Sequence, residues 1–306
     1  MRFVVSEMPA PSARSIEGHV HSVFRRVVNL RLADGDLLTL YAGGEDRQPP
    51  GAVRFAAPPA FDFSDHVFHR AAVSYRAGIL RIAGTDFSLD LRQARASAQT
   101  PIEPTQAGSG FSGSWRAGWH ILLSINVAAG LVVSLNGRRA AGSLDGALAA
   151  RARKTVPRLL NAAQKNDVEA ALAAAAQLVG AGPGLTPSGD DFLAGFLVGA
   201  RQTAQTDAAL SFVDTLGRRL TEYCSDSGDI SRSYLRHAAA GRIARPLAKL
   251  ARLIVEGASP IAIKPATVAA LHMGHSSGAD ATFGLLCGLA VGRSEVIEDI
   301  VTGLRR

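Results

Sequence analysis

The stretch GPGLTPSGDDFLAGFLVG, residues 182–199, joins a loop of glycine and proline to an apolar segment with helical spacing. Proline fixes its own φ and glycine permits positive φ, so the first six residues suit a rigid, tightly turned loop. In the segment that follows, Gly195 and Gly199 stand four residues apart and share one face of the expected helix. Such a face allows another backbone to approach closely.

A second segment repeats this pattern. Residues 188–199 can be laid over residues 277–288 with Ser, Gly, Asp, Gly and Gly in register, and a weaker third copy begins at Ser227. Gly284 and Gly288 again share one helix face. We therefore expect the two helices to pack together and to bring their N-termini to one place.

The repeat also predicts how both helices begin. Ser188 and Ser277 are expected N-caps, and Asp191 and Asp280 follow three residues later, so each pair forms a Ser-x-x-Asp capping box. Capping and close packing alone would explain either copy. The loop at residues 182–187 is not required by a plain cap, and it favours a functional site.

Backbone N–H groups of such a loop, next to a helix N-terminus, are suited to an anion. We expect an anionic metabolite to be bound by residues of both copies. The candidates of the first copy are Gly182, Gly184, Thr186, Ser188 and Gly189, and those of the second are Ser276, Ser277, Gly278 and Asp280.

Asp190 and Asp191 constrain the chemistry, because two adjacent carboxylates repel a bare phosphate. They favour a bridging Mg²⁺ held by both residues, or a ligand with N–H or O–H donors beside its anionic group. Alternatively, one Asp caps the helix and the other is a general base. With His275, which is suited to acid–base chemistry, metal binding or closure of the preceding helix, they are the candidate catalytic residues.

Arg232 is the candidate for a substrate carboxylate, which a guanidinium can bind in a bidentate manner. A solvated basic helix face is the alternative.

The sequence lacks the motifs typical of nucleotide sites. The loop does not have the Gly-Lys-Ser/Thr ending of a Walker A motif, and no Gly-x-Gly-x-x-Gly follows an expected strand.

Upstream of the helical repeat, the sequence predicts strands. Alternating residues at 28–32 and 37–41 flank Asp34-Gly35, which is a hairpin signal. Further short strands are expected at 73–76, 79–82 and 87–90, in a small barrel or curled sheet. Residues 101–113 form a break rich in Pro, Gly and Ser, and residues 115–135 are ambiguous, with 131–133 resembling a strand.

From residue 142 onward, Ala and Leu recur at helical spacing. We predict helices at 167–179, 188–203, 208–223, 228–240, 246–256, 265–273 and 277–291. The expected fold class is α+β, with a β-rich, barrel-like N-terminal domain at residues 1–138 and a mainly helical domain at residues 139–306 that carries the loop.

The composition indicates a globular protein with anionic partners. Hydrophobic residues make up 47% of the chain, and the formal net charge is +7, which favours anionic partners. The sequence has no basic block interleaved with aromatic residues, so nucleic acid binding is not expected. The cysteines, Cys224 and Cys287, form no Cys-x-x-Cys motif, which favours a reducing compartment. Without an apolar run near ~20 residues, no membrane span is expected. We expect a soluble, cytoplasmic protein.

Three motifs carry a family resemblance. GPGLTPSGDDFL at 182–193, DISRSYL at 229–235 and GHSSGAD at 274–280 resemble the AllH-like family, and the N-terminal region fits it at 22–24 and 28–30. The first motif is long and specific, and the other two support it.

The resemblance implies a subunit of oxamate carbamoyltransferase in the catabolism of purine-derived ureides, acting with an FdrA-like subunit and a further partner. The reaction class is phosphorolysis of oxalurate to oxamate and carbamoyl phosphate. A non-catalytic subunit that binds a metabolite or docks a partner is the alternative, and an assembly protein whose loop orders at an interface is another.

Overall fold

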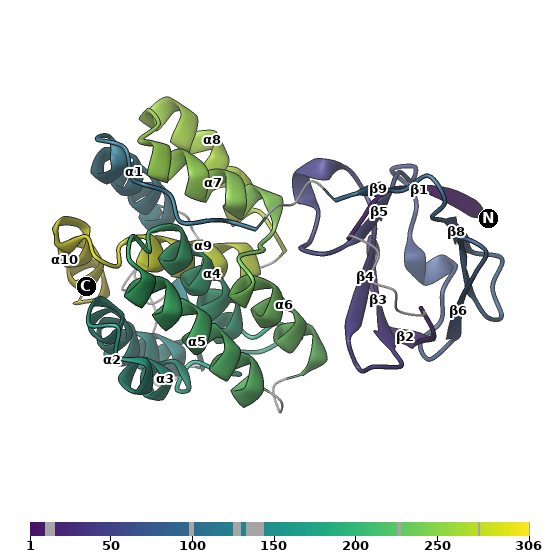
Figure 1. Cartoon of the computed structure of the whole chain (residues 1–306), viewed down its shortest axis with the longest axis horizontal. Helices are drawn as coiled ribbons and strands as arrows, with labels where there is room; N and C mark the ends of the chain where they lie inside the picture. Colours follow the sequence, from purple (N-terminus) through teal and green to yellow (C-terminus); the bar gives the residue numbers. More distant parts are fainter. Residues whose placement is uncertain are drawn as a thin grey trace. The chain divides into compact units, whose positions relative to one another are not determined.

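The computed structural model describes residues 1–9, 16–97, 101–124, 130–132, 144–224, 228–274 and 276–305. It forms two compact units, Met1–Thr100 and Pro101–Arg306, coloured purple to blue and blue to yellow in Figure 1. Strands make up the first unit and helices dominate the second, which confirms the α+β class expected from the sequence.

The first unit is a closed barrel. Its strands in the described residues are β1 (Arg2–Met8), β2 (Gly18–Val23), β3 (Val27–Leu32), β4 (Leu37–Ala42), β5 (Val53–Phe55), β6 (Ala72–Arg76), β7 (Ile79–Ile82), β8 (Ser88–Asp90) and β9 (Arg95–Ala96). Neighbouring strands follow the order β5-β4-β3-β2-β6-β7-β8-β1, and pairing of β1 with β5 closes the circle. The short β9 lies parallel to β1 outside it.

The expected hairpin of β3 and β4 is present and turns at Gly35, whose φ is 84°. The barrel is filled by aromatic side chains that are in ring contact with one another, namely Phe3, Phe55, Phe61, Phe63 and Phe87. The sequence has few aromatic residues, and a large share of its phenylalanines lies in this one small core.

The helical unit contains α1 (Phe111–Ser124), α2 (Leu144–Gln164), α3 (Val168–Ala175), α4 (Ser188–Gln202), α5 (Asp207–Tyr223), α6 (Asp229–Ala239), α7 (Arg245–Glu256), α8 (Pro260–Leu271), α9 (Ser277–Leu289) and α10 (Ser294–Arg305). Helix α1 packs against α7, α8 and α9. For this reason the compact units divide after Thr100, whereas the sequence placed the boundary after residue 138.

Three local predictions differ from the structure. Helix α3 ends at Ala175 rather than at residue 179, because Gln177 and Leu178 donate to carbonyls only three residues back and tighten the chain. Helix α8 begins at Pro260, so Pro265 lies inside it and not in its first turn. Leu131 and Val132 are not part of a strand.

Helix α8 tolerates its internal proline because the carbonyl that loses a donor belongs to Ile261, which is strongly exposed and open to water.

Within the part of the chain that the structure describes, no helix combines the length and the apolar composition that crossing a bilayer requires.

Candidate functional site

Helices α4 and α9 lie side by side in the helical unit (Figure 1) and pack backbone to backbone. A Cβ atom at Gly195 would lie 2.0 Å from the carbonyl oxygen of Ala281, and one at Gly284 would lie 1.8 Å from that of Phe192. Both glycines leave room that no other residue would. The close approach expected from the glycine spacing is therefore present.

The second pair of glycines continues this contact along the helices. A Cβ atom at Gly199 would lie 2.4 Å from the Leu285 oxygen, and one at Gly288 would lie 2.2 Å from the Phe196 oxygen. Contacts advance along both helices in the same direction, so α4 and α9 are parallel and their N-termini lie together. Figure 1 shows both helices surrounded by the other helices of this unit.

The two N-termini are joined by hydroxyl groups. The Thr186 Oγ1 atom lies 3.1 Å from the Ser277 Oγ atom, so the loop before α4 contacts the first residue of α9. Burial raises the pKa values of Asp191 and Asp280, and hydrogen bonds from the Ser277 hydroxyl to Asp191 and from the Ser188 hydroxyl to Asp280 oppose that rise. Each aspartate of the repeat is thus next to the serine of the opposite helix.

The expected capping boxes are wrong. The N-caps are Pro187 and Ser276, neither of which makes a side-chain cap hydrogen bond. The carbonyl of Pro187 accepts the N–H groups of Asp190 and Asp191, which puts Ser188 inside the first turn. A serine at that position cannot cap its own helix, so its hydroxyl is available to the neighbouring one.

Asp280 is held from a third direction. Its Oδ1 atom accepts the N–H groups of Leu131, at 2.7 Å, and of Val132, at 3.2 Å. Gly130 precedes them with a φ of 102°, and a Cβ atom there would lie 2.5 Å from Asp280 Oδ2. Residues 130–132, which overlap the segment that resembled a strand in the sequence, therefore cover this carboxylate with their backbone.

The loop before α4 is turned as tightly as its sequence predicted. Gly182 and Gly184 have φ values of 116° and 100°, in the region that favours glycine. Gly189 donates its N–H to the Ala181 carbonyl at 2.9 Å and closes the loop. At the tip of the loop, Leu185 leaves 59% of its surface exposed.

Helix α6 also reaches this region. The Ser231 hydroxyl donates to the Leu185 carbonyl at 3.5 Å. Burial raises the pKa of Asp190, and the Gly180 N–H group and the Ser231 hydroxyl oppose that rise. The Gly180 N–H group donates to Asp190 Oδ1 at 2.9 Å. Tyr234 stands one turn further along α6, near enough to Asp191 for that charge to act on it.

Three carboxyl groups are consequently buried at one place. Asp190, Asp191 and Asp280 are 2%, 7% and 0% exposed, and the Oδ2 atom of each has no hydrogen-bond partner within the described residues. A buried, unpartnered carboxylate oxygen is costly, because it loses water and gains nothing in return. The three groups therefore favour protonation or a bound donor.

The pKa values follow this environment. Burial raises the pKa of Asp191 to about 8; hydroxyl groups oppose the rise, and the charges of Asp280 and Asp190 add to it. Burial also raises the pKa of Asp280 to about 7, and that of Asp190 above its ordinary value. Burial and the Asp191 charge raise the pKa of Tyr234 to about 12, so its phenol stays a donor. The cluster can hold and exchange protons near neutral pH.

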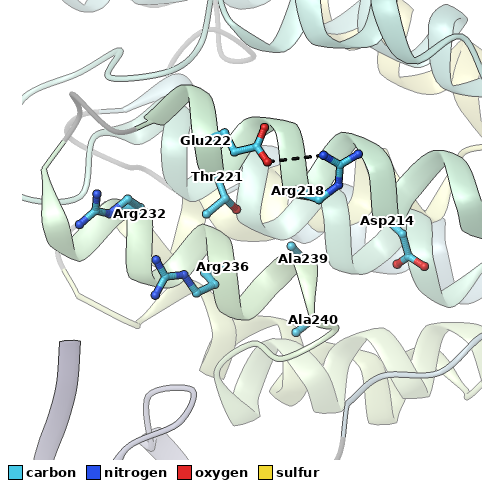
Figure 2. A pocket seen from close by; sticks show the side chains of 8 residues that line it. All are labelled: Asp214, Arg218, Thr221, Glu222, Arg232, Arg236, Ala239 and Ala240. Carbon is cyan, nitrogen blue, oxygen red and sulfur yellow. Dashed lines mark hydrogen bonds and ion pairs between the residues drawn. The ribbon is translucent and has the colours of Figure 1, made fainter. Parts of the chain in front are cut away.

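Arg232 lines a groove whose lining includes none of the three aspartates. Figure 2 shows it on the wall of this groove, between α5 and α6, where Arg218, Glu222 and Arg236 also lie. Its guanidinium forms an ion pair with Asp229 at 3.1 Å. The structure brings the loop, both serines and the three aspartates together, and it places Arg232 in the groove between α5 and α6.

Gly189 and Gly278 have packing roles that their positions in the motifs did not indicate. A Cβ atom at Gly189 would lie 1.8 Å from the Leu178 oxygen, and one at Gly278 would lie 2.3 Å from the Ala270 oxygen. The candidate His275 lies outside the described residues, as does Ser227. Ser276 is the N-cap residue of α9.

The described side chains include the two aspartates expected to hold Mg²⁺, Asp190 and Asp191. No group of three or more His, Cys, Asp or Glu residues among them is arranged to hold a metal ion. Asp190 and Asp191 have different neighbours, since the first accepts from Gly180 and the second lies near Ser277. A Mg²⁺ ion that bridges the two carboxylates stays a prediction.

Ser231, Tyr234 and the segment at 130–132 were missed by the sequence reasoning. Ser231 and Tyr234 are three residues apart on one face of α6, directly after the weak third copy of the motif, and that copy was the available signal. Nothing in the sequence indicates that Gly130 would approach Asp280.

Comparison with known families matches two segments of the chain to one family. A family model described as oxamate carbamoyltransferase subunit AllH matches residues 178–289, which run from just before the loop to the end of α9. A second model, the AllH family N-terminal domain, matches residues 6–97 in the barrel. No solved structure matches the chain. Because the two family models together cover most of its length, the chain belongs to the AllH family.

Proposed function

We propose that this subunit binds the anionic reactants of a carbamoyltransferase where its loop meets the N-termini of α4 and α9. The family name implies a subunit of oxamate carbamoyltransferase, and hence partner subunits. The observation that carries the finer proposal is the set of buried Oδ2 atoms of Asp190, Asp191 and Asp280, which have no partner among the described residues. The reactants are phosphate and oxalurate, in the ureide catabolism that the family name indicates.

The protonation of the cluster removes the difficulty of placing an anion beside carboxyl groups. Near neutral pH, the carboxyl groups of Asp191 and Asp280 are each protonated in a large fraction of molecules, because their pKa values are raised to about 8 and about 7. A protonated carboxyl group donates a hydrogen bond to a phosphate oxygen and does not repel it. The positive ends of two parallel helices add to this attraction.

The same groups suit the ureido part of oxalurate. Its N–H groups can donate to whichever carboxyl oxygen is deprotonated, and its carbonyl oxygen can accept from backbone N–H groups of the loop at Gly182 and Gly184. A developing oxyanion on that carbon would be stabilised in the same way. Thr186, Ser188 and Ser277 supply hydroxyl groups beside it, and Ser276, Gly189 and Gly278 fix the backbone around it.

The proposed reaction balances without any further reactant. A phosphate oxygen attacks the ureido carbonyl carbon of oxalurate, the bond from that carbon to the oxamate nitrogen breaks, and carbamoyl phosphate leaves. Hydrogen phosphate loses one proton and the departing nitrogen gains one. Asp191 is proposed to carry it, with Asp190 and Asp280 setting its charge, as general acid–base catalysis requires. His275 remains a further candidate for this proton transfer.

The burial of the cluster favours one alternative, in which the subunit binds a metabolite or orders a partner without catalysing the reaction. Asp280 is fully buried and already accepts two backbone N–H groups, as a structural carboxylate would. In that case the chemistry takes place on another subunit. Oxalurate would then still bind to this subunit, but substitution of its aspartates would leave turnover unchanged.

Turnover of oxalurate and phosphate by the assembled complex tests the proposal. Asp191→Asn keeps the size and hydrogen-bonding capacity of the protonated group, so it should fold, yet it cannot transfer a proton. We expect turnover to fall roughly 100-fold. The control is Asp207→Asn, in the first turn of α5, where the side chain is exposed and makes no described contact. Unchanged turnover in Asp191→Asn would rule out the catalytic role.

A further inference from the structure

A basic groove lies between α2 and α3, and its lining includes none of the three aspartates of the carboxyl cluster. It has a volume of about 840 Å³ and is lined on the α2 side by four cationic residues, Arg151, Lys154, Arg158 and Lys165. All four are exposed, and none forms an ion pair within the described residues. The acidic residue that lines it, Asp167, is already engaged, because its carboxylate caps α3 by accepting the Ala170 N–H group at 3.0 Å.

The cations are regularly spaced. Arg151 and Arg158 are seven residues apart on α2, and Lys154 shares their face. Lys165, seven residues after Arg158, directly follows the end of α2. Seven residues of helix span roughly 10.5 Å, so the positive charges recur once every two turns. A helix that lay along the groove with acidic residues at the same interval would meet each of them, as complementary charges do along coiled coils.

The opposite wall, on the α3 side, consists mostly of small side chains. Besides Gln177 it contains Ala170, Ala173 and Ala174, of which Ala174 is buried and the other two are exposed. Small residues at helical spacing allow a second helix to approach closely. Aromatic side chains, on which the bases of a single-stranded nucleic acid would stack, are missing from the residues that line the groove.

We propose that this groove is the docking site for an acidic helical segment of a partner subunit. Its charge supplies complementarity and its alanine wall supplies close packing. The inference goes beyond the reaction at the carboxyl cluster and rests only on the family's description as a subunit. Assembly and turnover are separate measurements, so either proposal can fail without the other.

Cross-linking of the wild-type complex is the first test. A carbodiimide joins lysine amines to carboxyl groups with no spacer, so it reports direct contacts. We expect Lys154 and Lys165 to be coupled to aspartate or glutamate residues of another subunit. Lys249 and Lys264, which are exposed on α7 and α8, are the internal controls. Absence of cross-links at both groove lysines would overturn the proposal.

Charge reversal is the second test. Arg151→Glu with Arg158→Glu should weaken assembly of the complex by about tenfold or more, measured by sedimentation, because two attractions become repulsions. Lys249→Glu with Lys264→Glu changes the net charge equally and should leave assembly unchanged. Equal assembly of both double variants would contradict the proposal. So would tight binding of a labelled oligo(dT) that required Arg151 and Arg158 while assembly stayed intact, since it would assign the groove to nucleic acid.

Discussion

The Thr186 hydroxyl oxygen lies 3.1 Å from the Ser277 hydroxyl oxygen, and this contact links the glycine–proline loop to the start of the second repeat. Both hydroxyl groups lower the pKa of Asp191 against the rise that burial causes. The loop and α9 therefore act on one carboxyl group, and the effect of either hydroxyl should be measurable through the titration of Asp191.

Thr186→Val and Ser277→Ala are expected to raise the pKa of Asp191 above about 8, because each removes a group that favours the charged form. In the assembled complex, the limb of the pH–rate profile that Asp191 governs should move to higher pH. Thr105→Val, which removes an exposed hydroxyl bonded to the Glu103 carbonyl, is the control. A profile unchanged in both site variants would show that Asp191 does not govern the rate.

The glycines between α4 and α9 should be intolerant of any side chain. We expect Gly195→Ala to cost about 3 kcal/mol of unfolding free energy, at the upper end for overpacking, because its Cβ atom would meet the Ala281 backbone. Gly113→Ala, on α1, has open space around it and should stabilise the protein by about 0.5–1 kcal/mol. Urea unfolding measures both, and similar values for the two would contradict the backbone packing.

These glycines show what the sequence can predict. Gly195, Gly199, Gly284 and Gly288 fall at helical spacing in two matching segments, so the close pair of helices could be foreseen. The turn at Gly35 was equally local. Closure of the barrel could not be foreseen, because β1 pairs with β5 through a contact between distant parts of the chain that leaves no local pattern.

The carboxyl cluster was predicted in part. The sequence placed Asp191 and Asp280 at neighbouring helix starts, but the capping rule assigned each to the serine of its own helix. Pro187 occupies the capping position of α4, and Ser188 is displaced into the first turn. The local rule therefore failed where tertiary packing offered each aspartate the serine of the other helix.

Arg232 can be tested as the group that holds the carboxylate of oxalurate. Because it is paired with Asp229 in the groove beside α5, a substrate carboxylate would have to join or replace that partner. If it does, Arg232→Gln should raise KM about tenfold with little change in kcat, since a uniform binding contact is lost. Arg218→Gln, in the same groove but paired with Glu222, is the control. Equal KM values in both variants would remove Arg232 from the site.

The buried cluster also predicts how stability depends on pH. The pKa values of Asp191 and Asp280 are about 8 and about 7 in the folded protein, against an ordinary value of 3.8. Between these limits the folded chain keeps protons that the unfolded chain has lost. The contribution of the two groups is therefore fully present below about pH 4 and is lost as the pH rises toward 8.

Asp191→Asn is expected to flatten this dependence, because asparagine binds no proton in either state. Between pH 5 and 7, the slope of unfolding free energy against pH should become less negative by about 1.4 kcal/mol per pH unit, the value for one proton. Asp207→Asn should keep the wild-type slope, since that carboxyl group is exposed on α5. Denaturant titrations at several pH values measure all three slopes. If the slope of Asp191→Asn matches that of the wild type, Asp191 is charged throughout this range, and burial does not raise its pKa as expected.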